Sequence, residues 1–204
     1  MRIKICGVTR TGDARRAGRL GAWAIGMIFV PDTPRFLTAD RAKKVRAAIP
    51  KGVKAVGVFR NPSREEILRA VRELNLDMVQ IYGKAPSGLR VPAISVVEIG
   101  RRRPRIPRFG PTDFVLVEPE RTLADRRAGR GPSEKSRWAA RALVAAWQKR
   151  GLRVLLGGGL NAQNVAEAVT ASPWAVDVSA GVEGRAGCKD LKLLRRFFQE
   201  ANRG

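Results

Sequence analysis

Histidine does not occur anywhere in the 204 residues of this chain. The side chain that most often moves protons near neutral pH is therefore missing. A histidine-based catalytic triad, a histidine-ligated metal site and an imidazole proton shuttle are all excluded. Any proton transfer by this chain must use carboxyl, thiol, amine or phenol groups instead.

Cysteine is scarce, and long hydrophobic runs are absent. The two cysteines, Cys6 and Cys188, cannot form a framework of disulfides and lie in different contexts, which is typical of a cytoplasmic protein with reduced thiols. No apolar run reaches the roughly 18 residues of a membrane span. Arg2 and Lys4 interrupt the apolar start of the chain, so we expect neither a signal peptide nor a membrane partner.

Acidic residues are few: 18 aspartates and glutamates oppose 40 lysines and arginines, for a formal net charge of +22. Such an excess favours either a nucleic-acid partner or a solvated basic surface. Aromatic residues, which stack on bases, make up only 6% of the chain, and we find no helix-turn-helix, zinc-finger or RNA-binding signature. We therefore expect a solvated surface and no specific nucleic-acid partner. The sparse asparagine, glutamine and cysteine fit a thermophile.

Eight short apolar runs alternate with helix-like stretches along the chain. Near-continuous apolar runs are typical of parallel strands that are buried on both faces. The runs are residues 3–6, 24–30, 55–59, 78–81, 93–97, 114–117, 154–156 and 175–178. This alternation predicts an α/β fold, a single small (β/α)8 barrel domain over residues 1–204. The alternative is an open doubly wound sheet, but no Gly-x-Gly-x-x-Gly motif follows the first run.

The stretches between the runs carry helix signals. Ser63 and Glu66 form a capping box, and Asn161 is placed to cap a helix over residues 162–170. The other helices are predicted over residues 13–20, 38–49, 63–74, 133–149 and 189–201. Two units lack room for a regular helix. Only residues 82–92 separate the fourth and fifth runs, and prolines interrupt the basic connector 100–111. We expect eroded helices after the fourth and fifth strands.

Active sites of such barrels lie at the C-terminal ends of the strands. Cys6 ends the first run, on the same face as Arg2 and Lys4, and Glu118 follows the sixth run. Alone, a cysteine there is more often a small buried side chain than a reactive one, although nearby positive charge favours its thiolate. The other strand-end candidates are Arg35, Tyr82, Glu98, Gly158, Gly159, Asp177, Ser179 and Gly181.

Two glycine-rich turns follow the seventh and eighth runs. The first contains Gly158 and Gly159, and the second contains Ser179 and Gly181. Glycine lets a ligand approach the backbone closely, and helix N-termini present free N–H groups. Either turn alone could be a plain tight connection. Two turns with free backbone N–H groups after the last two strands match the phosphate site common in these barrels, so we expect phosphate to bind there.

A specific resemblance is carried by the segments KICGVT (4–9), TPRF (33–36), GVF (57–59), VQIYG (79–83), GGGLNAQNV (157–165) and VDVSAGVEGRAGCKD (176–190). In these motifs, their order and their spacing, the chain resembles the phosphoribosylanthranilate isomerases. The resemblance implies a (β/α)8 barrel without metal or organic cofactor. It implies an isomerase of tryptophan biosynthesis that converts N-(5-phosphoribosyl)anthranilate to 1-(2-carboxyphenylamino)-1-deoxyribulose 5-phosphate by Amadori rearrangement.

The resemblance also implies roles for individual residues. Cys6 resembles the general base that takes the C2 proton of the opened Schiff-base intermediate. Arg35 resembles the residue that meets the anthranilate carboxylate, which suits a planar guanidinium. The two glycine-rich turns resemble the grip on the phosphate of the small-molecule substrate. For Lys4 and Asp177 we expect a buried structural pair. For the oligomeric state, both a monomer and a homodimer remain compatible with the sequence.

The chain departs from the family pattern at several positions. Glu118 stands where the family has its general acid, an aspartate, and we expect it to protonate the ribose ring oxygen with a pKa raised by burial. Asp125 is the alternative acid. Tyr82 replaces a usual histidine, Ala180 replaces a usual serine, and the loop 126–135 is more basic and poorer in glycine.

Three further hypotheses remain open beside the isomerase. The first is a related barrel enzyme for another aminoaldose phosphate, although the two-aspartate isomerases of histidine synthesis fit poorly because Cys6 ends the first run. The second is a diverged or engineered phosphate-binding barrel with weak or no isomerase activity. The third is nucleic-acid binding. The position of Glu118 discriminates: a carboxyl in the barrel mouth with Cys6 favours the isomerase.

Overall fold

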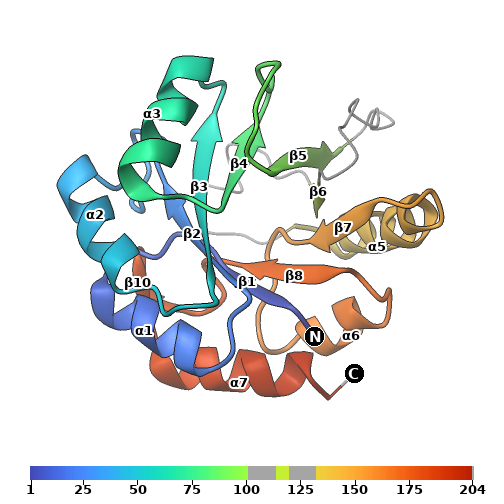
Figure 1. Cartoon of the computed structure of the whole chain (residues 1–204). Coiled ribbons are helices and arrows are strands. Elements are labelled where there is room, and N and C mark those ends of the chain that lie inside the picture. The colour runs from blue at the N-terminus through green and yellow to red at the C-terminus, as the bar shows by residue number, and fades with distance from the viewer. Residues whose placement is uncertain (101–113, 120–131, 204) are drawn as a thin grey trace.

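Eight parallel strands close into a barrel in sequence order in the computed structural model, which describes residues 1–100, 114–119 and 132–203 (Figure 1). The strands are β1 Ile3–Ile5, β2 Ala24–Ile28, β3 Lys54–Arg60, β4 Met78–Tyr82, β5 Ala93–Ile99, β6 Phe114–Pro119, β7 Arg153–Leu156 and β8 Ala175–Val178. The barrel closes between β1 and β8, where Lys4 is the register partner of Asp177. The (β/α)8 prediction is confirmed.

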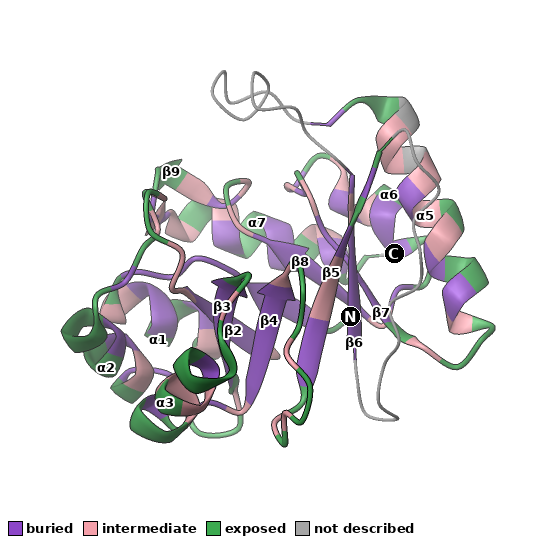
Figure 2. Cartoon of the chain, turned by 90° about the horizontal axis from the view of Figure 1, so that it is seen from above, coloured by how far each residue is buried: buried purple, intermediate pink, exposed green. Residues whose placement is uncertain are grey.

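Helices surround the barrel, with their buried faces toward the strands and their exposed faces outward (Figure 2). They are α1 Thr11–Arg19, α2 Ala39–Ala47, α3 Arg64–Leu74, α5 Glu134–Gln148, α6 Val165–Val169 and α7 Leu191–Ala201. The capping box of α3 is present: Glu66 N–H donates to Ser63 Oγ at 3.1 Å, and Ser63 N–H donates to Glu66 Oε2 at 2.7 Å. These bonds satisfy two N–H groups that a helix start leaves unpaired.

The connection after β4 contains no helix over residues 83–92, as expected for an eroded unit. The basic connector expected after β5 lies outside the described residues, apart from its first residue. Two details of the prediction are wrong near the C-terminus. The helix expected over 162–170 starts only at Val165, because Asn161 instead pairs with Gly181 in an isolated parallel bridge. A short hairpin, β9 Glu183–Arg185 with β10 Cys188–Lys189, precedes α7, which starts at Leu191 behind the cap Asp190.

The barrel interior is apolar in its lower half and polar above. The lower layer contains Ala24, Val56, Met78, Ile94, Phe114, Leu116, Leu155 and Ala175. Burial of each large apolar side chain contributes about 1.5–3 kcal/mol. Trp174 packs against this layer, with its ring centroid 4.8 Å from that of Trp23 and 4.9 Å from that of Phe114. Above it, buried Lys4, Gln80 and Asp177 replace apolar side chains toward the C-terminal mouth.

Candidate active site

A pocket of about 210 Å³ opens at the C-terminal ends of the strands. It is lined by Cys6, Ile28, Val30, Thr33, Arg35, Val58, Arg60, Tyr82, Glu118, Gly158, Gly159, Leu160, Asp177, Ser179, Ala180 and Gly181. All seven residues selected from the sequence as catalytic or substrate-binding line this one pocket. They come from β1, β6 and the loops after β2, β7 and β8, which meet only because the barrel closes.

Cys6 follows β1, and its backbone N–H donates to Val178 O at 2.8 Å. Its side chain is 5% exposed. Gly26 on β2 leaves room beside it, since a Cβ there would lie 2.9 Å from Cys6 Sγ and 3.3 Å from Lys4 Nζ. Burial raises the pKa of the Cys6 thiol above its usual range, although the charge of Lys4 works in the opposite direction. The thiol is therefore mainly protonated at neutral pH.

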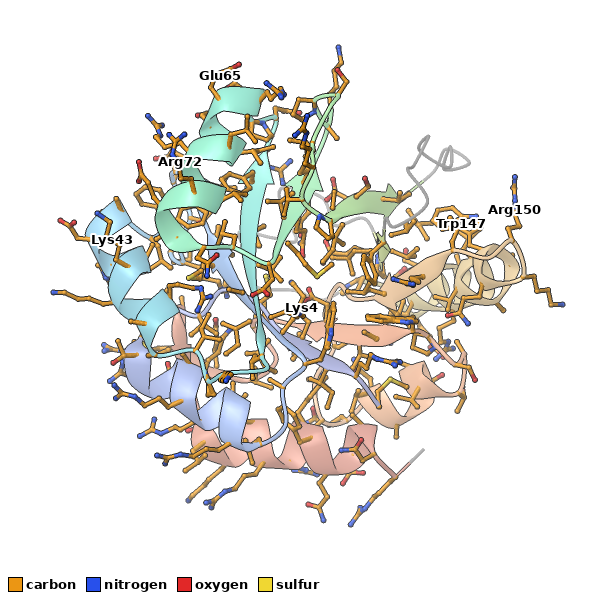
Figure 3. The ribbon with its side chains drawn as sticks, in the orientation of Figure 1. Lys4, Lys43, Glu65, Arg72, Trp147 and Arg150 are labelled. Atoms are coloured by element: carbon orange, nitrogen blue, oxygen red, sulfur yellow. The ribbon has the colours of Figure 1, made fainter. Side chains whose placement is uncertain are left out.

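Lys4 lies inside the barrel (Figure 3), and a Cβ on Gly26 would come close to both its Nζ and Cys6 Sγ. Its Nζ donates to Asp177 Oδ1 at 2.6 Å, and its side chain is fully buried. Burial works to lower the pKa of Lys4, but the charges of Asp177 and Cys6 outweigh burial and raise the pKa. The lysine thus stays a fixed cation under the pocket, and it favours the thiolate of Cys6. The structural pairing expected for Lys4 and Asp177 is present.

Glu118 lies half-buried near the end of β6, and its carboxylate contacts Tyr82 of β4. Tyr82 Oη donates to Glu118 Oε2 at 3.1 Å. Burial and the charge of Asp177 raise the pKa of Glu118 to about 7, while the Tyr82 hydrogen bond lowers it. A carboxyl with that pKa is protonated in a large fraction of molecules at neutral pH, which is what a general acid requires. Glu118 thus has the raised pKa expected from the sequence.

Arg35 lies in the loop after β2 and is held by Glu183. Arg35 Nε donates to Glu183 Oε1 at 2.9 Å, and Nη2 donates to Oε2 at 2.5 Å. The buried Lys189 donates from Nζ to Glu183 Oε1 at 2.8 Å and to Ser179 O at 3.0 Å. A Cβ on Gly7 would lie 2.4 Å from Arg35 Cδ, so the arginine rests across this glycine. One edge of the guanidinium is used by Glu183, which leaves the Nη1 side for a ligand.

The two glycine-rich turns meet at the bridge between Asn161 and Gly181. Gly158 and Gly159 have φ of +82° and +92°, a backbone conformation that favours glycine. Within the described residues, no backbone or side-chain acceptor is recorded for the N–H groups of Gly158, Gly159, Ser179 and Ala180. The buried Ser179 Oγ also lacks a partner there. Unpaired N–H groups in two adjacent turns form a cradle suited to an anion.

Sequence reasoning missed three residues that shape this pocket: Gln80, Glu183 and Lys189. Gln80 lies in an apolar strand, where nothing local marks it as a neighbour of the site. Glu183 and Lys189 flank a glycine turn, but no spacing rule connects them to Arg35. The alternative acid Asp125 and most of the loop 126–135 lie outside the described residues. No group of His, Cys, Asp and Glu side chains suited to a metal ion occurs among the residues that the structure describes.

Comparison with known proteins agrees with this geometry. The family model described as N-(5′-phosphoribosyl)anthranilate (PRA) isomerase matches residues 3–200. The chain is 38% identical to the isomerase of Halorhodospira halophila over 215 residues, covering 100% of this chain and 97% of the relative. It is 36% identical to the isomerase of Acidithiobacillus ferrooxidans over 207 residues, covering 97% and 95%.

Solved structures agree as well. A crystal structure of phosphoribosyl anthranilate isomerase from Thermotoga maritima superposes with a TM-score of 0.83 at 28% identity, covering all of both chains. A phosphoribosyl anthranilate isomerase in complex with reduced 1-(o-carboxyphenylamino)-1-deoxyribulose 5-phosphate superposes with a TM-score of 0.79 at 27% identity, again over all of both chains. No helix in the described part of the chain is long and apolar enough to cross a membrane. The chain belongs to the N-(5′-phosphoribosyl)anthranilate isomerase family.

Proposed function

We propose that this chain isomerises N-(5′-phosphoribosyl)anthranilate in tryptophan biosynthesis, the activity named for its family, and that Cys6 and Glu118 carry the two proton transfers. The observation that supports this most strongly is a carboxyl with a pKa of about 7 in the same pocket as a buried thiol and a cradle of N–H groups that have no acceptor among the described residues. General acid catalysis requires such a pKa near the working pH.

The reaction starts with ring opening. Glu118 donates its proton to the ribose ring oxygen while the bond from C1 to that oxygen breaks. The lone pair of the anthranilate nitrogen forms the C1=N bond of a protonated Schiff base. The negative charge left on Glu118 lies above the buried, positively charged Lys4, which lowers the pKa of this carboxyl. The acid is thereby kept able to release its proton.

The second step removes a proton from C2. The thiolate form of Cys6, the minor form at neutral pH, takes this proton, the C2–H electron pair forms C1=C2, and the C1=N pair returns to nitrogen. The enol then loses its hydroxyl proton while C1 gains a proton, which gives the 2-ketone product. The sum is an isomerisation without a change in oxidation state overall, and no co-reactant is consumed. Lys4 favours the thiolate that this step needs.

Substrate binding uses the two ends of the pocket. The phosphate accepts hydrogen bonds from the N–H groups of the two glycine-rich turns. The anthranilate carboxylate accepts from the free Nη1 side of Arg35, which Glu183 holds in place. These contacts orient the ribose so that C2 faces Cys6 and the ring oxygen faces Glu118. Orientation of this kind supplies a large part of the rate enhancement in enzymes.

The test is conversion of freshly made N-(5′-phosphoribosyl)anthranilate, followed by the change in its fluorescence. Cys6→Ser and Glu118→Gln should each lower kcat by roughly 100- to 10,000-fold while the circular dichroism spectrum stays that of the parent. Asp125→Asn is the matched control and should stay active. A parent protein that binds phosphate but converts no substrate would favour the diverged barrel instead. A fully active Glu118→Gln variant would show that another residue is the general acid.

We also propose the finer properties expected from the sequence: one domain, a cytoplasmic location, phosphate binding, a thermophilic source and a monomer or homodimer. Both cysteines are free thiols, which supports a reducing compartment. A crystal structure of monomers of a dimeric isomerase from Thermotoga maritima is among the similar folds. Light scattering tests the oligomeric state, and thermal unfolding tests the thermophilic source.

A further inference from the structure

The side chains of Tyr82 and Glu118 contact each other in the pocket. Tyr82 ends β4 and Glu118 lies on β6, with β5 between them. The hydroxyl of Tyr82 donates to Glu118 Oε2 at 3.1 Å. This contact joins a residue to which no role has been given so far to the group that we have proposed as the acid.

A hydrogen bond from Gln80 determines that the Tyr82 hydroxyl is the donor to Glu118. Gln80 lies two residues earlier on β4, and its side chain points into the same barrel interior as Tyr82. Its Nε2 donates to Tyr82 Oη at 3.4 Å, and Gln80 is fully buried. Because the phenol oxygen already accepts from Gln80, its own hydrogen is available for Glu118. Three side chains thus form a chain of donors that runs from the barrel interior to the pocket.

The chain of donors distinguishes the two oxygens of the carboxyl. An oxygen that accepts from Tyr82 is the carbonyl oxygen of a neutral carboxyl, so the acidic proton resides on the other oxygen. We propose that Tyr82, supported by Gln80, is a positioning residue that holds Glu118 Oε2 and thereby places the transferable proton on Oε1. This proposal deepens the proposed isomerase function and rests on Glu118 being its acid.

Other charged groups around Glu118 come from several strands. Asp177 on β8 and Glu98 on β5 raise its pKa, after burial, and Lys4 on β1 and the Tyr82 hydroxyl on β4 lower it. Arg60 on β3 lies over the ring of Tyr82, with its guanidinium carbon 5.0 Å from the ring centre. Removal of the Tyr82 hydroxyl leaves Asp177 and Glu98 unopposed by that hydrogen bond. The pKa of Glu118 should then rise further.

Tyr82→Phe tests the proposal, because it removes the hydroxyl and keeps the ring under Arg60. We expect kcat to fall about tenfold, the size of one lost hydrogen bond to an ionisable group, with little change in KM. The alkaline limb of the pH profile of kcat/KM, where Glu118 loses its proton, should move to higher pH. In the Glu118→Gln background the same substitution should cause no further loss. Thr170→Val, which removes a hydroxyl outside the pocket, is the control and should change neither kcat nor the profile.

Failure of the proposal differs from failure of the proposed function. The titration of the Glu118 carboxyl carbon can be followed by NMR in glutamate-labelled protein, where Glu118→Gln identifies the resonance, and it needs no activity. An upward shift in Tyr82→Phe supports the proposal even if the parent is inactive. An unshifted titration, or an equal loss of kcat in both backgrounds, overturns it. If Tyr82→Phe does not fold, Gln80→Leu removes the supporting donor and should shift the same resonance; an unshifted resonance there also overturns it.

Discussion

Lys4 and Asp177 form a buried ion pair across the seam where β1 meets β8, with 2.6 Å between Nζ and Oδ1. Asp177 lines the pocket that contains Cys6 and Glu118, and Lys4 lies beneath it. The same two charges therefore stabilise the contact between β1 and β8 and shift the pKa values of Cys6 and Glu118. Removal of one partner leaves an uncompensated charge in the interior, and such a charge is far more costly than the loss of an exposed pair.

Lys4→Met should lower the free energy of unfolding by about 3–5 kcal/mol in urea titrations, because Asp177 loses its counter-charge. Lys4→Met combined with Asp177→Asn should recover part of this loss. Lys54→Met is the matched control, since Lys54 forms an exposed pair with Asp77 at 3.3 Å and should cost less than about 1 kcal/mol. Equal losses for Lys4→Met and Lys54→Met would contradict the buried-pair interpretation.

Glu118→Gln should stabilise the fold above neutral pH while it removes activity. The pKa of Glu118 rises from 4.5 to about 7 on folding, so the folded protein binds more protons than the unfolded chain between these values. Stability from this group therefore falls as pH rises through that window, by on the order of 3 kcal/mol. Glu118→Gln should exceed the parent in unfolding free energy at pH 8 and lose this advantage near pH 4.5. A variant that is less stable than the parent at pH 8 contradicts the raised pKa.

Glu183→Gln should raise KM more than it lowers kcat. The carboxylate of Glu183 holds two guanidinium nitrogens of Arg35, and an amide can accept only at its single oxygen. Arg35 then loses its fixed orientation toward the substrate carboxylate, and we expect KM to rise about tenfold. Glu200→Gln, which breaks an exposed pair with Arg203, is the control. Steady-state kinetics check this, and an unchanged KM would show that Arg35 does not depend on Glu183.

Gly181→Ala should weaken phosphate binding and destabilise the barrel. A Cβ at this position would lie 1.9 Å from Leu160 O, so the two glycine-rich turns must separate. Calorimetry with inorganic phosphate should show a clear loss of affinity. Gly12→Ala is the control: nothing lies within 4 Å of its Cβ, and alanine should stabilise α1 by about 0.5–1 kcal/mol. Unchanged phosphate binding in Gly181→Ala would place the anion elsewhere.

Rising salt should lower kcat/KM and change kcat less. The chain has a formal net charge of +22, and the proposed substrate carries both a phosphate and a carboxylate. Positive potential speeds capture of such an anion, and salt screens it. DNA should bind weakly and without sequence preference, and should dissociate at moderate salt. Sequence-specific DNA binding that survives physiological salt would contradict this interpretation of the basic surface.

The sequence was sufficient for the barrel and for much of the pocket. A strand buried on both faces must be apolar along its length, so the eight runs were visible without tertiary information. Because catalytic groups of this fold stand where strands end, Cys6 and Glu118 could be selected from position alone. Glycine in the turn after β7 was likewise readable, since few other residues accept the positive φ of Gly158 and Gly159.

The partners of these residues were decided only by the tertiary structure. Lys4 lies 173 residues from Asp177, Arg35 lies 148 from Glu183, and Tyr82 lies 36 from Glu118. Local patterns extend over a few residues and carry no information about which strands meet when the barrel closes. The pKa of Glu118 depends in the same way on burial and on charges from three other strands. Sequence therefore determined which groups are present at the mouth, and closure of the barrel decided which of them touch and how readily each releases a proton.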